Sequence, residues 1–274
     1  MKQNTKKWLR LVLLAVFCVS TALLLRQFLD NAGGSNAYAD ALQIAQKTEN
    51  APAASQPRDA VQSEAPQGPR WVPAPVENDP NMQTLETMDL EALRQVNGDV
   101  IGWIWIPDSN IHYPLMQGPD NDYYLKRTWE GKENSVGSIF LEWRNDPALT
   151  DYNTIIYGHN MNDGSMFANL KRYSAQWYFD RHPYVYIATD AGVFRYEVFS
   201  SYEAGIDSIT YGLSFQQEKT KADFLIHALE KSRYDTGIVP QPNDRILTLS
   251  TCSGMGHDNR WVVHARLKMV EITE

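Results

Sequence analysis

Apolar and polar residues alternate in short stretches from about residue 100 onward, and this pattern predicts a series of β-strands. The clearest example is residues 245–251, in which Leu247, Leu249 and Thr251 share one face. Turn signals such as Asp190-Ala-Gly192 separate several stretches. Eight short strands in under 200 residues predict a mostly β fold that closes, or nearly closes, into an eight-stranded barrel. The predicted strands are residues 100–106, 111–116, 137–143, 153–157, 184–189, 193–202, 245–251 and 260–271.

Helical spacing of apolar residues is confined to a few places in this part of the chain. Leu90, Leu93 and Val96 predict a helix over 88–96, which Asn97-Gly98 would end. Residues 220–232 predict a second helix, placed before the penultimate strand, with an apolar stripe that includes Phe224 and Leu225. The barrel is therefore expected to carry an N-terminal helix and one later helix.

The first 30 residues differ from the rest because an apolar run, Trp8 to Leu25, follows several basic residues. Eighteen helical residues span about 27 Å, close to the ~30 Å apolar core of a bilayer. Residues 1–30 therefore predict a cytoplasmic stub and a transmembrane signal anchor, which makes a single-pass cell-membrane protein with an extracellular domain. A cleaved signal peptide is the alternative, but the small-x-small sequence Ala37-Tyr38-Ala39 lies 12 residues beyond Leu25.

Residues 31–80 hold seven of the fourteen prolines together with much alanine, glutamine and serine. Such a composition buries too little apolar surface to fold, so it predicts a flexible spacer. The folded, catalytic domain is then expected to occupy residues 81–274.

Charge is distributed unevenly between these parts. Residues 1–30 carry five Lys/Arg and one Asp, a net of +4, whereas the remainder carries 20 Lys/Arg and 32 Asp/Glu, a net of −12. An acidic domain argues against nucleic acid as a partner, because that partner requires a basic surface.

Cys252 is the only cysteine outside the apolar N-terminal run, so the predicted exported part has no intrachain disulfide. It ends one predicted strand, and Arg260 opens the next after a short loop. If these strands pair as a hairpin, the thiol and the guanidinium lie a few ångströms apart. This arrangement suits a thiolate nucleophile with a cation beside its reaction intermediate.

A free cysteine titrates near ~8.5, so a nucleophilic thiol needs a base or a charge partner. The candidate is His159, which follows the strand 153–157 through Gly158 and precedes a polar turn. The sequence contains no Cys/His cluster with zinc spacing, no P-loop and no GxGxxG motif. We therefore predict a Cys-His-Arg site with no metal and no cofactor.

These residues resemble the class B sortases, which are membrane-anchored cysteine transpeptidases of Gram-positive bacteria. The resemblance covers about residues 85–270. It includes one departure, Glu142, where the family pattern leads us to expect aspartate. The matching stretches are residues 100–107, 117–125, 137–145, 157–167 and 248–252, followed by Arg260.

The resemblance implies a sortase-type β-barrel in which Cys252 is the nucleophile, His159 the acid/base and Arg260 the oxyanion-stabilising cation. It implies cleavage of a C-terminal sorting signal after threonine through a thioester, and transfer of the protein to a cell-wall amine. The implied partners are secreted proteins that bear sorting signals, a lipid-linked peptidoglycan precursor, and the membrane through the N-terminal helix. Weaker expectations for substrate binding fall on Asn160, Ser250, Thr251 and Ser253.

Two other functions fit parts of the same sequence. An L,D-transpeptidase also uses exported cysteine and histidine, but its cysteine lies in a Ser-x-Gly-Cys-x-Arg pattern that is absent here. A non-catalytic, membrane-tethered binding barrel is the alternative from another class. It would have no need of all three residues Cys252, His159 and Arg260.

Overall fold

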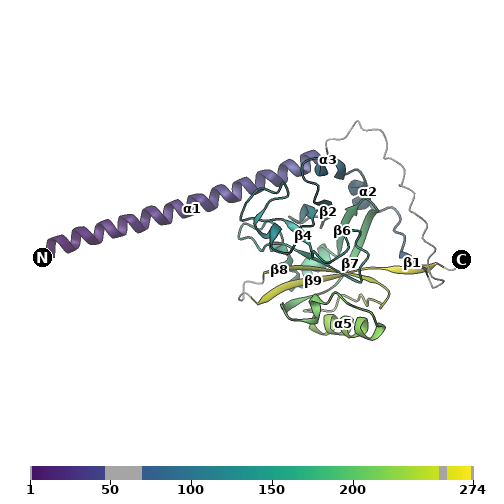
Figure 1. Ribbon diagram of the computed structural model, residues 1–274. Helices are drawn as coiled ribbons and strands as arrows, with labels where there is room; N and C mark the ends of the chain where they lie inside the picture. The colour runs from purple at the N-terminus through teal and green to yellow at the C-terminus, as the bar shows by residue number, and fades with distance from the viewer. Residues whose placement is uncertain (1, 47–69, 253–257, 273–274) are drawn as a thin grey trace.

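The computed structural model describes residues 2–46, 70–252 and 258–272, and its centre is a closed barrel with strand order β2-β3-β4-β5-β8-β9-β7-β6 (Figure 1). Neighbouring strands are antiparallel except for the parallel pairs β3–β4 and β5–β8. The predicted mostly β, eight-stranded barrel is confirmed. Its strands are β2 (Val100–Trp105), β3 (His112–Met116), β4 (Ile139–Leu141), β5 (Asn153–Tyr157), β6 (Tyr184–Thr189), β7 (Gly192–Gly205), β8 (Arg245–Cys252) and β9 (Asn259–Leu267).

The strands β8 and β9 form the hairpin that alternation predicts, with Leu249 opposite Val263 and Cys252 opposite Arg260. Leu247 and Leu249 pack in the main core inside the barrel. Ile246, on the other face, belongs to a second core that covers the outside of the hairpin. Both faces are therefore buried, which places this hairpin among the most enclosed strands of the molecule.

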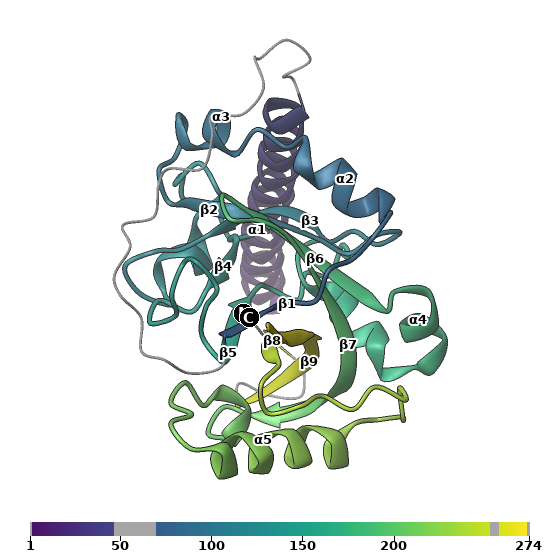
Figure 2. The ribbon, with the colours of Figure 1, turned by 90° about the vertical axis from the view of Figure 1, so that its right-hand side faces the viewer.

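The outer core is supplied by α5 (Glu218–Lys231), the helix predicted before the penultimate barrel strand. Its residues Phe224, Leu225 and Ala228 pack in one cluster with Ile246 and Val262. Figure 2 shows this helix lying along one side of the barrel, beneath β8 and β9. Because both hairpin faces have apolar cover, the strand ends are held in a fixed position.

Two predicted strands differ in their limits from those observed. The stretch predicted at 137–143 is shorter, because Gly137 has a φ of +66°, outside the extended region. The stretch predicted at 260–271 is broken after Leu267, and its last part becomes β10 (Met269–Ile272). This strand pairs antiparallel with β1 (Arg70–Pro73) in a separate two-stranded sheet, which the sequence did not predict.

Shorter helices complete the described chain. The helix predicted at 88–96 is present as α3 (Leu90–Arg94), with Asp89 as its N-cap. The elements that the sequence did not predict lie mostly in connections that lack a clear apolar period. The short helices are α2 (Pro80–Glu86), α3 (Leu90–Arg94), α4 (Gln176–Arg181), η1 (Tyr123–Lys126), η2 (Ala168–Ser174) and η3 (Ile209–Tyr211).

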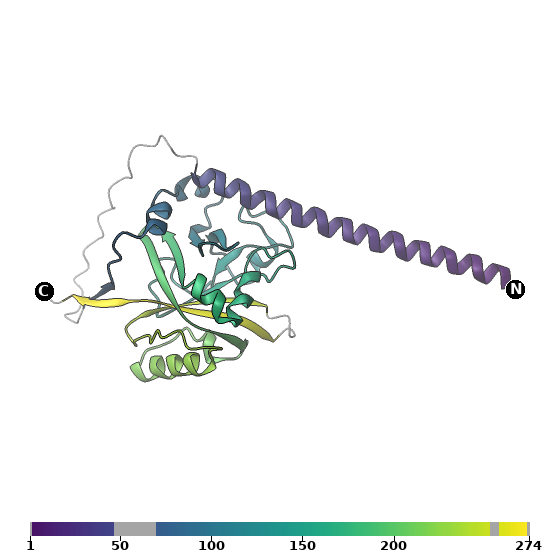
Figure 3. The same cartoon turned by 180° about the vertical axis from the view of Figure 1, so that it is seen from behind.

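The N-terminal segment is one helix, α1 (Lys2–Gln46), whose last turns pack on the barrel while its beginning projects away from it (Figure 3). Ala41 and Ala45 are fully buried there. The Trp129 indole donates a hydrogen bond to the Ala37 carbonyl (2.7 Å), and the Tyr38 hydroxyl donates to the Gly137 carbonyl (2.5 Å). This helix therefore contributes directly to the main core.

The predicted transmembrane anchor, and with it the single-pass cell-membrane location, is wrong. Among the described residues, no helix combines the length and the apolar character that crossing a bilayer requires. The charge-free part of the apolar run lies between Arg10 and Arg26. It spans only about 22 Å as a helix, short of a ~30 Å bilayer core.

The spacer predicted at 31–80 is not uniform. Residues up to Gln46 are helical, and Arg70–Pro73 form a strand, while 47–69 lie outside the described residues. The division of the chain into a stub, a spacer and a domain at 81–274 otherwise stays a prediction.

Candidate active site

Two parallel strands bring the predicted histidine and cysteine to the same end of the barrel. In the β5–β8 ladder, Tyr157 pairs with Ser250, and the Gly158 N–H donates to the Ser250 carbonyl (3.2 Å). His159 and Cys252 each lie two residues beyond that last pair. Because adjacent strands advance at the same rise per residue, the two backbones reach the same level.

Arg260 joins this end of the barrel through the hairpin, since its Cα is the direct partner of Cys252 in the β8–β9 ladder. The guanidinium is partly buried, and its Nη1 donates to the Asn259 carbonyl (3.1 Å). The prediction that the thiol-bearing and guanidinium-bearing residues face each other across a hairpin is therefore confirmed for the backbone. The side chain of Cys252, and the whole of Ser253, lie outside the described residues.

A tight turn holds His159 by its backbone and by its ring. The Phe167 N–H donates to the His159 carbonyl (2.9 Å), and the Asp163 carboxylate accepts hydrogen bonds from the Ser165 N–H and hydroxyl within the turn. Nε2 of His159 lies 2.7 Å from the Leu125 carbonyl. A carbonyl can only accept, so Nε2 carries a proton and Nδ1 is the nitrogen available for proton exchange.

Two glycines allow close packing at this histidine. A Cβ added to Gly137 would lie 2.8 Å from Cδ2 of the His159 ring, whereas one on Gly158 would collide with the side chains of Ile139 and Phe167. Gly137 also has a positive φ of +66°. A side chain at either position would push the ring or the strand that carries it.

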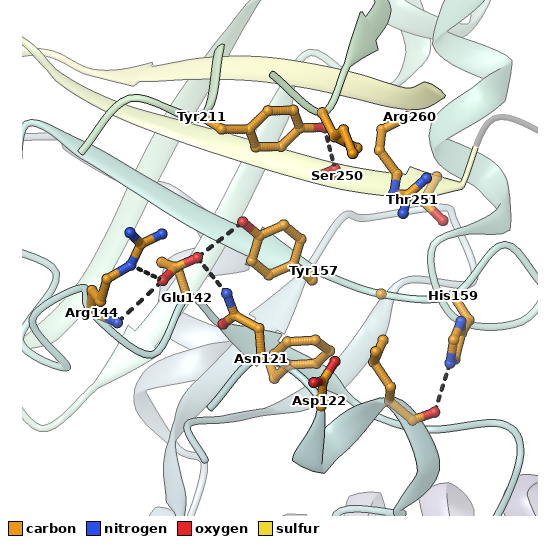
Figure 4. Close-up of a pocket in the computed structure, with 14 residues that line it drawn as sticks. Asn121, Asp122, Glu142, Arg144, Tyr157, His159, Tyr211, Ser250, Thr251 and Arg260 are labelled. Carbon is orange, nitrogen blue, oxygen red and sulfur yellow. Dashed lines mark hydrogen bonds and ion pairs between the residues drawn. The ribbon is translucent and has the colours of Figure 1, made fainter. Parts of the chain in front are cut away.

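His159 and Arg260 line one cavity of about 450 Å³, together with the predicted residues Ser250 and Thr251 (Figure 4). Asn160 does not line it and instead forms a backbone bridge with Met166. The cavity runs along the β4, β5 and β8 strands and is walled by residues from several connections. Its lining residues are Asn121, Asp122, Leu125, Phe140, Glu142, Arg144, Tyr157, Gly158, His159, Ile206, Tyr211, Ser250, Thr251 and Arg260.

The β8 residues in this wall are fixed in different ways. Oγ of Ser250 and the Tyr211 hydroxyl are hydrogen-bonded at 2.9 Å, which ties η3 to β8. Oγ1 of Thr251 is buried and has no hydrogen-bond partner within the described part of the chain. A buried hydroxyl without a partner is costly, so this oxygen lowers the stability of the cavity wall.

A carboxylate network at the other end of the cavity was not predicted from the sequence. Glu142, only 1% exposed, accepts hydrogen bonds from Nε of Arg144 (2.7 Å), Nδ2 of Asn121 (2.6 Å) and the Tyr157 hydroxyl (3.1 Å). The amide of Asn121 is fixed at both ends, because its Oδ1 accepts from the Trp143 N–H (3.1 Å). The sequence signal was a carboxylate directly after an apolar strand, followed two residues later by an arginine.

The electrostatics of this network follow from the same contacts. Burial acts to raise the pKa of Glu142, but hydrogen bonds from Arg144, Asn121 and Tyr157 outweigh it, so the pKa lies below the ordinary 4.5. Burial and the Glu142 charge raise the pKa of Tyr157 well above 10. Glu142 is therefore an anion near neutral pH, and Tyr157 is a neutral donor.

The described residues hold no cluster of three or more His, Cys, Asp or Glu side chains arranged for a metal ion. The expectation of a site without metal or cofactor stays a prediction.

Comparisons with known proteins agree with this geometry. Residues 104–268 match the family model described as "Sortase domain". Sortase B of Listeria monocytogenes is 38% identical over 164 residues, which cover 60% of this chain and 67% of that protein. The Staphylococcus aureus sortase B–substrate complex has a TM-score of 0.62 at 30% identity, covering 67% of this chain and 85% of that one. A sortase B complexed with triglycine has the same TM-score and identity, covering 67% of this chain and 86% of that one.

Proposed function

Because the chain belongs to the class B sortases, a group of cysteine transpeptidases, we propose that it cleaves a C-terminal sorting signal after threonine and transfers the acyl group to an amine. The observation that carries the assignment of residues is the ladder geometry: parallel β5 and β8 end together, and Cys252 pairs with Arg260. The nucleophile is Cys252, the acid/base is His159 and the oxyanion partner is Arg260.

In the first half-reaction, the Cys252 thiolate attacks the carbonyl carbon of the threonine. The carbonyl π electrons move onto oxygen, and the Arg260 guanidinium stabilises this negative charge where it develops. The C–N bond then breaks and its electron pair leaves with nitrogen. Protonated His159 gives that nitrogen a proton from Nδ1, so the products are a thioester and a free amine.

The second half-reaction reverses these roles with a different amine. The incoming amine attacks the thioester carbonyl, His159 accepts its proton, and the thiolate departs as the new amide forms. The Leu125 carbonyl supports this role, because it holds Nε2 and leaves Nδ1 to exchange protons in both steps. One histidine therefore serves as acid and then as base.

The substrates we propose are secreted proteins with Asn-Pro-x-Thr or Leu-Pro-x-Thr sorting signals, and a peptidoglycan precursor that supplies the amine. Solved structures of sortase B include a substrate complex and a complex with triglycine, which supports a peptide donor and an amine acceptor here. An elongated cavity that includes Asn121, Ser250 and Thr251 gives polar contacts for an extended peptide. Family membership argues against the L,D-transpeptidase alternative.

The test is to incubate the full chain with each peptide and to measure the intact mass, followed by digestion to locate the adduct. We expect a thioester on Cys252 and release of the C-terminal fragment, and neither with Cys252→Ala. The far-ultraviolet spectrum of that variant controls for its fold. Turnover by Cys252→Ala at the wild-type rate would exclude the mechanism. Peptide binding without any adduct would favour a non-catalytic binding barrel.

A further inference from the structure

The end of the cavity remote from His159 and Arg260 has a cation of its own. Arg144 lines this end, and Figure 4 shows it across the cavity from both residues. Its side chain is 54% exposed. The neighbouring Trp143 is 50% exposed. We call Trp143 and Arg144 the distal lip.

The guanidinium of Arg144 is held along one edge only. Its Nε donates to the buried Glu142 carboxylate, and its Cζ lies 5.9 Å from the centroid of the Trp143 ring, within cation–π range. Among the described residues, its two terminal nitrogens make no hydrogen bond. A guanidinium fixed in this way presents two parallel N–H donors outward, the geometry that matches a carboxylate.

The role of Arg144 as counter-ion to Glu142 does not by itself explain why Nε, and not a terminal nitrogen, makes the contact. A buried carboxylate needs donors, but Glu142 already accepts from Asn121 and Tyr157 as well as from Nε of Arg144. A terminal nitrogen could have supplied that charge equally well. The observed contact leaves the edge with the two terminal nitrogens free of hydrogen bonds among the described residues, on a side chain that lines the cavity.

The strand register gives the distance from the reaction centre. β4 ends at Leu141, and the Glu142 N–H donates to the Ile155 carbonyl, so Glu142 lies near the level of Ile155 on β5, four residues before His159. Trp143 and Arg144 follow in a turn that the Asn145 N–H closes on the Glu142 carbonyl (2.9 Å), and the Arg144 guanidinium stays beside Glu142. Four residues correspond to about 13 Å along a strand. An extended peptide anchored through its threonine spans this distance with about four residues, which brings the residue just upstream of a four-residue motif to Arg144.

We propose that the distal lip binds an acidic side chain one or two positions upstream of the four-residue sorting motif, with Arg144 as the specificity-determining residue. The inference rests on the proposed function, because the peptide must be anchored at Cys252. The acyl part of the peptide stays on the enzyme through both half-reactions. A contact to that part therefore assists both steps.

The test uses peptides that place Asp, Ala or Lys at each of the two upstream positions, with kcat/KM measured for the full chain. We expect Asp to be preferred over Lys by about three- to fivefold, the effect of a partly exposed ion pair. The preference should shrink in 0.5 M salt because the pair is screened. Arg144→Glu should reverse it, so that Lys peptides react faster than Asp peptides.

Two further variants separate recognition from stability. Glu142→Gln/Arg144→Gln removes the pair without leaving an unpaired buried charge, and should abolish the preference. Arg181→Glu changes an exposed arginine that does not line the cavity, and should keep it. Equal rates for Asp and Lys peptides in the wild type, or an unchanged preference in Arg144→Glu, would overturn the inference. Absence of a Cys252 adduct with every peptide would instead count against the proposed function.

Discussion

At Arg260, the shape of the cation matters as much as its charge. A lysine at this position keeps the charge but replaces the planar fork with a single ammonium on a flexible stem. We expect Arg260→Lys to lower kcat by roughly tenfold to a hundredfold, because the stabilisation is needed where charge develops in the transition state. Single-turnover kinetics of thioester formation measures this directly.

Arg181→Lys is the matched control, because that arginine is exposed and does not line the cavity. Its rate should equal that of the wild type. Wild-type kcat in Arg260→Lys would mean that charge alone is sufficient, and would remove the argument for the fork.

Glu142, in the cavity wall, contributes to the pH dependence of the free energy of unfolding. Its pKa is lower in the folded chain than the ordinary 4.5, so its contribution to stability is full above pH 4.5 and is lost as pH falls through the lowered value. Glu142→Gln should therefore lower the free energy of unfolding at pH 7 and flatten its decline below pH 4.5. Urea denaturation at a series of pH values tests this sign.

The same substitution should reduce kcat/KM for the sorting peptide, because glutamine offers one acceptor oxygen in place of two, so that Asn121 and Tyr157, or Arg144, face an NH2 group instead of an acceptor. Glu130→Gln is a suitable control, since Glu130 does not line this cavity. An identical pH slope in Glu142→Gln and wild type would show that this carboxylate does not carry the acid dependence.

At the scale of elements, α1 contacts the loop residue Gly137, which packs against the His159 ring. Its Tyr38 hydroxyl donates to the carbonyl of Gly137, the residue that packs against the His159 ring, and the Tyr38 ring contacts Tyr113 edge-on. Tyr38→Phe keeps the ring and loses the hydrogen bond. We expect it to destabilise the fold by about 1 kcal/mol and to lower kcat more than it changes KM.

Thermal unfolding and steady-state kinetics measure these two effects. Gln43→Ala, on an exposed position of the same helix, should change neither. An unaltered kcat in Tyr38→Phe, despite the lost stability, would show that α1 does not influence the position of His159.

Elements specified by residues close together in the sequence were predicted well, and pairings between distant residues were not. Alternation predicted the β8–β9 hairpin and the pairing of Cys252 with Arg260, because the pattern and the short loop lie within 25 residues. The pairing of β5 with β8 joins residues almost a hundred apart, and no local pattern specifies it. The presence of His159 at a strand end was predictable, but its level relative to Cys252 was not.

The carboxylate network was missed for the same reason. Asn121, Glu142 and Tyr157 come from three segments that only the barrel brings together. The strand β1 was hidden because Arg70–Pro73 lies in a proline-rich region, and its partner β10 is far away in sequence. In the N-terminal run, the apolar pattern was clear, but the predicted membrane span Trp8 to Leu25 included the charged Arg10. Without it, the uncharged part of the helix is too short to cross a bilayer.

For the molecule as a whole, two histidines that the fold encloses contribute to the response to acid. Burial lowers the pKa of His112 to about 4 and that of His264 to about 3, both below the ordinary 6.5. Between pH 6.5 and 4 the unfolded chain binds protons that the folded chain does not, so stability is present above 6.5 and falls as pH decreases. We expect the free energy of unfolding to decline in this window.

His112→Gln/His264→Gln should be less stable at pH 7, because His264 is hydrogen-bonded to Thr248 and Tyr202, but its pH dependence between 6.5 and 4 should be flatter. Chemical denaturation of both proteins at pH 7, 6, 5 and 4 provides the comparison. Parallel curves would assign the acid dependence to other groups.

The central claim is that the thiol, the imidazole and the guanidinium meet one substrate carbonyl at one end of the barrel. A crystal structure of Cys252→Ala with a bound sorting peptide tests it most directly. We predict that the threonine carbonyl oxygen lies within hydrogen-bond distance of the Arg260 guanidinium, with the scissile nitrogen facing Nδ1 of His159. A peptide bound elsewhere, or a His159 ring turned away from the scissile bond, would contradict the account.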